Sequence, residues 1–133
     1  SRTLARRVIA AVARSDLFSS IVFSSFDPDT VRLLRRMAPQ ARIGILCTPG
    51  ETEDALRLAT ELDAENLHPA RTMADAAFVA EVHTLGRKVW AWSANTPASI
   101  EELVTVGVDG IFSDYIDRVR AVLERSGKRT IAG

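Results

Sequence analysis

Hydrophobic and polar residues follow two alternating periods along this chain. Five short runs rich in β-branched and aromatic residues predict strands over residues 21–26, 42–46, 66–68, 88–94 and 110–113. Between them, apolar residues lie three and four positions apart, as in Val31, Leu34 and Met37, which is the spacing of one helix face. The strand centres recur every 21 to 24 residues, so the pattern predicts five successive βα units. One further helix, over residues 3–13, is predicted ahead of the first strand.

Residues that start and end helices support these boundaries. The predicted first turns carry four capping sequences: Asp27-Pro28, Thr48-Pro49-Gly50-Glu51, Thr72 with Asp75, and Thr96-Pro97. Gly86, Gly107 and Gly127 lie where left-handed C-terminal caps are expected.

Parallel strands joined by helices are compatible with two α/β architectures. One is a complete five-stranded doubly wound sheet, and the other is a consecutive part of a (β/α)8 barrel. Five units are too few to close such a barrel, which takes about 250 residues. In both architectures ligands bind at the carboxyl ends of the strands, so candidate site residues are sought there.

Composition and charge narrow the class of protein. The 133 residues balance 17 Lys and Arg against 17 Asp and Glu, and 47% are hydrophobic, which predicts one folded domain and argues against nucleic-acid partners. Apolar runs stay below the roughly 18 residues that a membrane span needs. A single cysteine, Cys47, favours a reducing compartment, and we expect a cytoplasmic location. The chain starts at Ser1 without Met or a signal-like segment, so processing or truncation is expected to set that residue.

Candidate catalytic residues at the strand ends are few. His68 follows the third strand but has no sequence partner to orient it, and His83 falls within a predicted helix, where a solvated or packing role is expected. Cys47 has no nearby base and fits a small buried thiol. Chemistry alone therefore predicts no complete active site.

Acidic residues also have structural explanations. Asp27 and Asp29 could form a metal pair, but helix capping accounts for them more simply. Glu61, Asp63 and Glu65 form a charged stretch that predicts a solvated surface. A glycine-rich phosphate loop is missing after every predicted strand, which counts against nucleotide binding.

Two motifs near the carboxyl end are specific. The segments Lys88-Val89-Trp90-Ala91-Trp92-Ser93-Ala94-Asn95 and Gly107-Val108-Asp109-Gly110-Ile111-Phe112-Ser113-Asp114 resemble the Trp-Thr-Val-Asn and Gly-Val-Asp-Gly-Ile motifs of the glycerophosphodiester phosphodiesterase family. Ser25-Phe26, residues 42–46 and the segment around His83, Gly86 and Val89 match the same family at its spacing. Departures are Ser93, Ala94 and Ser113, which are mild, and Tyr115, which replaces a usual Pro and changes the loop after the last strand.

The resemblance implies a fold and a function. It implies that the chain forms the last five βα units of a (β/α)8 barrel, preceded by one helix, as a single partial domain over residues 1–133. The parent would be an enzyme of lipid and glycerol metabolism that hydrolyses glycerophosphodiesters to glycerol 3-phosphate and an alcohol, with Ca²⁺ or Mg²⁺ as cofactor. Its general acid/base histidines and metal ligands would lie upstream, so we expect this chain alone to be inactive and to contain no catalytic or metal-ligating residue.

By the same resemblance, this chain would face the small-molecule substrate. Trp92 would line the glycerol end of the pocket, and Ser25 and Phe26 would form a wall. Asn95 is included in the substrate-binding set, with the alternative that it only caps or shapes the turn before Thr96.

Two other functions stay open at this point. A non-catalytic α/β binding or assembly module would use the strand edge that five units leave exposed, which invites self-association. A self-sufficient doubly wound ligand binder would need a strand order with a central switch point.

Overall fold

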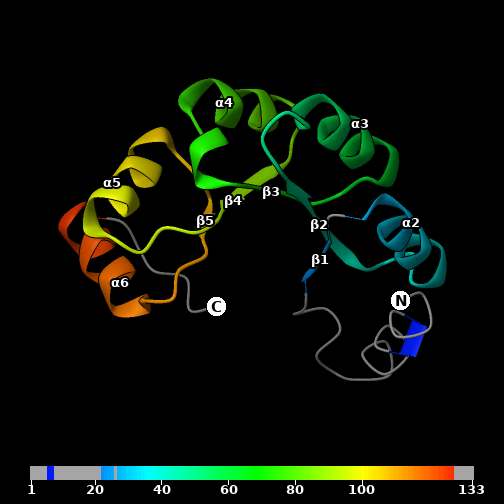
Figure 1. Ribbon diagram of the computed structural model, residues 1–133, viewed down its shortest axis with the longest axis horizontal. Coiled ribbons are helices and arrows are strands. Elements are labelled where there is room, and N and C mark those ends of the chain that lie inside the picture. Colours follow the sequence, from blue (N-terminus) through cyan, green and yellow to red (C-terminus); the bar gives the residue numbers. More distant parts are fainter. Residues whose placement is uncertain (1–5, 8–21, 26, 128–133) are drawn as a thin grey trace. The chain divides into compact units, whose positions relative to one another are not determined.

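The computed structural model describes residues 6–7, 22–25 and 27–127. Its helices and strands alternate along the chain (Figure 1): β1 (Val22–Ser25), α2 (Pro28–Met37), β2 (Arg42–Cys47), α3 (Thr52–Leu62), β3 (Asn66–Pro69), the short 3₁₀ helix η2 (Arg71–Met73), α4 (Ala76–Thr84), β4 (Lys88–Ala91), α5 (Pro97–Val106), β5 (Gly110–Ile111) and α6 (Ile116–Arg125). The five predicted βα units are therefore confirmed. The predicted helix over residues 3–13 and the side chain of Phe26 lie outside the described residues.

The strand order distinguishes the two predicted architectures. The sheet runs β1-β2-β3-β4-β5 in sequence order, and the pairs are parallel in both ladders where Val22 faces Arg42 and Trp90 faces Gly110. A doubly wound sheet needs an order that reverses at a switch point. Strands in simple sequence order are those of consecutive barrel units, so the fold is part of a (β/α)8 barrel and the doubly wound alternative is wrong.

The chain divides into two compact units, Ser1–Leu67 and His68–Gly133. In the first unit, Ile43, Ile45 and Cys47 alternate along β2 and are fully buried, as the period of two in a strand requires. Val31 and Leu34 on α2 are also buried. These side chains form the apolar core of the first unit.

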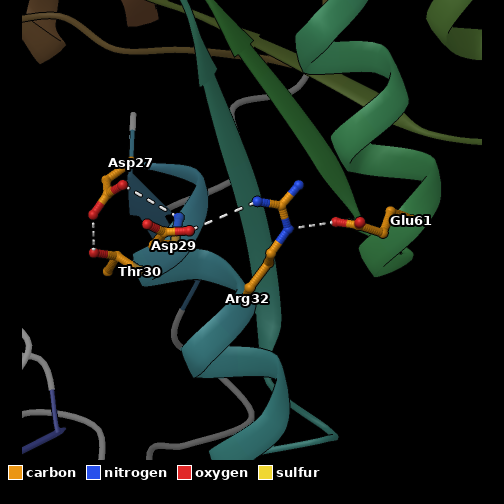
Figure 2. Close-up of polar contacts among 5 residues, drawn as sticks. All are labelled: Asp27, Asp29, Thr30, Arg32 and Glu61. Atoms are coloured by element: carbon orange, nitrogen blue, oxygen red, sulfur yellow. Dashed lines mark hydrogen bonds and ion pairs between the residues drawn. The ribbon is translucent and has the colours of Figure 1, made fainter.

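Arginine side chains fasten the elements of the first unit. Arg32 on α2 donates to Glu61 on α3 at 2.8 Å and also lies 3.8 Å from Asp29 (Figure 2). Arg42 on β2 binds both carboxylate oxygens of Glu65 at 2.6 Å. The charged stretch lies at the surface as predicted, with Glu61 and Asp63 exposed and Glu65 partly exposed, and the structure adds that Glu61 and Glu65 each pair with an arginine.

In the second unit the core lies between the sheet and its helices. Its buried members are small or aliphatic: Ala74, Ala91, Ala94, Ile100, Leu103, Val104 and Val122. Ala74 follows η2 and the others come from β4, the loop after it, α5 and α6; they leave the other face of β4 to larger aromatic side chains.

Two helix caps form as predicted. Asp27 accepts hydrogen bonds from the Asp29 amide at 3.2 Å and the Thr30 hydroxyl at 2.6 Å (Figure 2), so capping explains this aspartate. Thr96 caps α5 in a reciprocal capping box with Ser99. Gly86, Gly107 and Gly127 have positive φ, as expected.

Two other caps differ from the prediction. Thr48 is not a cap, because α3 begins only at Thr52; its hydroxyl instead donates to the Glu51 carboxylate at 2.6 Å. Thr72 lies in η2, and Asp75 caps α4 by accepting from the Phe78 amide at 2.8 Å. In both places the helix starts later than the capping sequence suggests.

Two predicted strands are shorter in the structure. The predicted strand over 88–94 ends at Ala91, and that over 110–113 ends at Ile111. Beyond Ala91 the backbone amides diverge, because Trp92 donates to Pro69 on one side and Ala94 donates to Phe112 on the other. The segment after Ala91 therefore connects the ends of β3 and β5 by single hydrogen bonds and does not continue the β4 ladder.

Candidate substrate-binding site

Three aromatic side chains meet near the carboxyl ends of β3, β4 and β5. The His68 ring stacks on Trp90, with centroids 5.5 Å apart and planes 10° from parallel. Phe112 presents its edge to His68 at 5.2 Å and to Trp90 at 6.1 Å. These three residues are called the aromatic cluster below. Their rings pack against one another, and Phe112, the most exposed of them, is 40% exposed.

Strand parity places the aromatic cluster opposite the helices. Leu67, Val89 and Ala91 are fully buried, and they alternate with His68 and Trp90 along β3 and β4. In a barrel the face opposite the helices is the interior, where ligands bind at the carboxyl end. The aromatic cluster therefore lies on the ligand-facing side of its strands.

Burial determines the charge state of His68. Only 1% of the residue is exposed, and burial lowers the pKa of its imidazole from 6.5 to about 4. His68 is therefore neutral at pH 7. The sequence suggested no partner to orient this ring; the structure corrects that, because Trp90 and Phe112, distant in sequence, hold it.

Trp92 follows β4 directly and is half-buried. Its indole Nε1 donates to the carbonyl oxygen of His68 at 2.6 Å, and its backbone bridges to Ala70. The peptide bond between Trp92 and Ser93 is cis. An indole fixed at its nitrogen presents a rigid apolar surface, which is the property required of a pocket wall.

Asn95 lies at the centre of a polar network. Its Oδ1 accepts from the Ser113 hydroxyl at 3.1 Å and from the Asp114 amide at 2.9 Å, while its Nδ2 donates to the Asp114 carboxylate at 3.2 Å. Its carbonyl accepts from Arg118 at 2.8 Å. Trp92 and Asn95 thus lie on the same loop after β4, with hydrogen-bond partners on opposite sides of it.

The other predicted wall residues belong to the first compact unit or are not described. The Ser25 hydroxyl, at the end of β1, accepts from the Asp27 amide at 3.1 Å. Phe26 lies outside the described residues. A joint role for Ser25, Phe26, Trp92 and Asn95 in one pocket therefore stays a prediction.

The remaining candidates have structural roles. Cys47 is buried, and its thiol donates to the Ile45 carbonyl at 3.3 Å. His83 is partly exposed on α4, and its Nε2 lies 2.7 Å from Asp109, which also accepts from the Val89 amide at 2.8 Å. Within the described ranges, no three His, Cys, Asp or Glu residues are placed to hold a metal ion.

Two contacts escaped the sequence-based interpretation. The His83–Asp109 pair spans 26 positions, and periodicity carries no signal for it. The Arg118 guanidinium lies 3.9 Å from the centroid of the Tyr115 ring. Tyr115 and Arg118 are three positions apart at the start of α6, and this spacing could have suggested their contact from the sequence.

Parallel strands in sequence order, with an aromatic wall at their carboxyl ends, define a part of a (β/α)8 barrel. The model of the glycerophosphoryl diester phosphodiesterase family matches residues 2–118, and the chain belongs to this family. No helix among the described residues has both the length and the apolar character needed to cross a membrane.

Known relatives show the same likeness over half of their length. A glycerophosphodiester phosphodiesterase of Caldanaerobacter subterraneus is 26% identical over 121 residues, which cover 91% of this chain and 49% of the relative. A Silicibacter pomeroyi structure described as a glycerophosphoryl diester phosphodiesterase has a TM-score of 0.88 and 28% identity, covering 98% of this chain and 46% of its own. The chain thus spans about half the length of the curated relatives it matches.

A third similar structure was solved with a bound molecule. It is an Oleispira antarctica phosphodiesterase in complex with the product sn-glycerol-3-phosphate, with a TM-score of 0.79 and 23% identity, covering 93% of this chain and 52% of that protein. This likeness shows the fold.

Proposed function

We propose that this chain is the substrate-facing carboxyl portion of an enzyme that hydrolyses glycerophosphodiesters to glycerol 3-phosphate and an alcohol. The observation that carries the proposal is Trp92. It lies in the family's tryptophan motif, directly after β4, with its indole nitrogen bonded to the His68 carbonyl. Family membership over residues 2–118 supports the reaction class.

The proposed role of Trp92 is to hold the glycerol end of the substrate. An indole face offers apolar contact to the C–H groups of a glycerol backbone, while its fixed orientation limits the poses that the bound group can take. The aromatic cluster, on the ligand-facing side of β3 and β4, is proposed as the apolar floor of the same site. Ser25 and Phe26 are proposed as a second wall.

Acid/base and metal chemistry are assigned to sequence outside this chain. Ca²⁺ or Mg²⁺ needs several oxygen ligands, and the described residues offer no cluster that fits either ion. The neutral, buried imidazole of His68 is enclosed by aromatic rings and so makes a poor general base. We therefore propose that the catalytic histidines and the metal ligands lie upstream, in the other half of a barrel of which this chain would be the carboxyl part.

A cytoplasmic location is proposed on the single buried thiol of Cys47, which suits a reducing compartment.

The second candidate function is an assembly module, and the edge of the sheet favours it. Among the described strands, β5 pairs with β4 alone, so its other edge offers backbone groups for a further strand. Self-association through this edge is the prediction of that alternative.

Release of glycerol 3-phosphate tests the proposal. Glycerophosphocholine is incubated with Ca²⁺ or Mg²⁺ and either the 133-residue chain or a longer protein that contains it. We expect turnover only by the longer protein. Turnover by the isolated chain would show that the catalytic groups lie within it, and no turnover by the longer protein on any glycerophosphodiester would overturn the assigned reaction.

A further inference from the structure

The loop after β4 is held from two sides, by the end of β3 with the start of η2 and by the loop after β5. On one side the Trp92 amide donates to the Pro69 carbonyl at 3.0 Å, and the Trp92 carbonyl accepts from the Arg71 amide. On the other side the Ala94 amide donates to the Phe112 carbonyl at 3.1 Å. The position of Trp92 therefore depends on the end of β3, on η2 and on the loop that follows β5.

Asn95 provides most of the side-chain contact on the β5 side. Both polar atoms of its amide group are used by the loop after β5, through Ser113 and Asp114. The Ser113 hydroxyl also accepts from the Tyr115 amide at 3.0 Å, which ties the same network to the start of α6. An amide whose donor and acceptor are both engaged has little capacity left for a substrate.

Arg118 fastens the network from the first turn of α6. Its Nη1 donates to the Asn95 carbonyl at 2.8 Å, and its guanidinium lies on the Tyr115 ring. The planar guanidinium suits a hydrogen bond and a ring contact at once, which a lysine cannot reproduce. Tyr115 is also the residue that departs from the family's usual Pro.

We propose that Asn95 and Arg118 are positioning residues that clamp the loop after β4 to the loop after β5 and thereby hold the Trp92 wall in place. The inference deepens the proposed function, on which its kinetic consequence rests. Of the two roles expected for Asn95, it favours the structural one over substrate contact and extends it to support of Trp92. It also gives Tyr115 a purpose, as the surface on which Arg118 is oriented.

Indole N–H resonances report on the clamp without any enzyme assay. The chain has two tryptophans, so a ¹⁵N-labelled sample gives two indole signals, which Trp90→Phe and Trp92→Phe assign. We expect Asn95→Ala and Arg118→Ala to shift or broaden the Trp92 signal and to speed its hydrogen exchange, with the Trp90 signal unmoved. Arg118→Lys should restore the signal only in part.

Arg120 supplies the matched control. It is exposed on the same helix, and Arg120→Ala should leave both indole signals in place. Because Arg118 is also exposed, its replacement is expected to leave the fold intact, which far-ultraviolet circular dichroism checks. An unchanged Trp92 signal in both Asn95→Ala and Arg118→Ala would overturn the clamp, whatever the enzyme assay shows.

Kinetics in the longer protein separate positioning from a general loss of structure. Losing about one net hydrogen bond predicts a KM for glycerophosphocholine raised by about 2- to 10-fold in Arg118→Ala, with kcat less affected. If Arg118→Ala leaves the KM of an active enzyme unchanged, the clamp is contradicted but the proposed function is not. Absence of turnover in the unmodified enzyme would contradict the proposed function and leave the indole result standing.

Discussion

The indole of Trp90 lies directly over the Cα of Gly110, its register partner on β5. A Cβ atom at this glycine would lie 2.8 Å from Cδ1 and 2.9 Å from Cγ of Trp90, closer than real side chains approach. Gly110 is therefore needed for space, and its backbone φ is not positive. The second glycine of the Gly-Val-Asp-Gly motif lets Trp90 lie flat between His68 and β5.

Gly110→Ala is expected to destabilise the second unit, because the Trp90 ring is held by His68 and Phe112 and cannot yield freely. Overpacking of this kind costs about 1–3 kcal/mol. Urea unfolding of Gly110→Ala measures the cost. In a Trp90→Leu background the same substitution should cost much less, and equal costs in the two backgrounds would contradict the contact.

Asp75→Ala tests which residue caps α4, because the sequence predicts a cap formed by Thr72 together with Asp75. Asp75 accepts from the Phe78 amide, and removing such a cap costs about 1 kcal/mol in the free energy of unfolding. Thr72→Ala is the matched control, since Thr72 is exposed in η2 and should cost little. A larger effect at Thr72 than at Asp75 would restore the cap predicted from the sequence.

His68 makes stability depend on pH. Its pKa is about 4 in the folded protein and near 6.5 when unfolded, so the unfolded chain takes up the proton first as the pH falls. Stability is therefore lost from about pH 6.5 downward. Between pH 7 and pH 5 we expect a loss of about 2 kcal/mol from this group.

The control for this pH dependence is a pair of variants. His68→Phe keeps a flat ring in the aromatic cluster and should remove the loss between pH 7 and pH 5 in urea titrations. His83→Gln should leave most of it. If His68→Phe retains the full pH dependence, another group is responsible.

The hydrophobic pattern of the sequence predicted the order of the strands and helices correctly, but not the residue at which each of them ends. Apolar and β-branched runs located all five strands: β2, β3 and β4 bury alternate or consecutive residues, whereas the residues of β1 and β5 are at most partly buried. The same pattern extended the strand beyond Ala91, since Trp92 and Ala94 continue the alternation although their amides bond to different neighbours. Spacing alone left two architectures open, because strand order is a property of long-range pairing.

The candidate site was predictable where a motif carried it. Trp92 and Asn95 stand out within their motif, but the hydrogen bonds of Asn95 to Ser113 and Asp114 connect residues 18 and 19 positions apart. No periodicity records such contacts. The neutral state of His68 likewise follows from burial by Trp90 and Phe112, which only the folded chain brings together.

The most direct test of the central claim is the KM for glycerophosphocholine of the longer protein carrying Trp92→Ala. Loss of the wall that orients the glycerol end predicts a KM raised by about tenfold or more, the equivalent of about 1.4 kcal/mol of binding, with Arg120→Ala unchanged. A Trp92→Ala enzyme that folds, turns over substrate and keeps the KM of the unmodified protein would contradict the assignment of this chain as the substrate-facing portion of the enzyme.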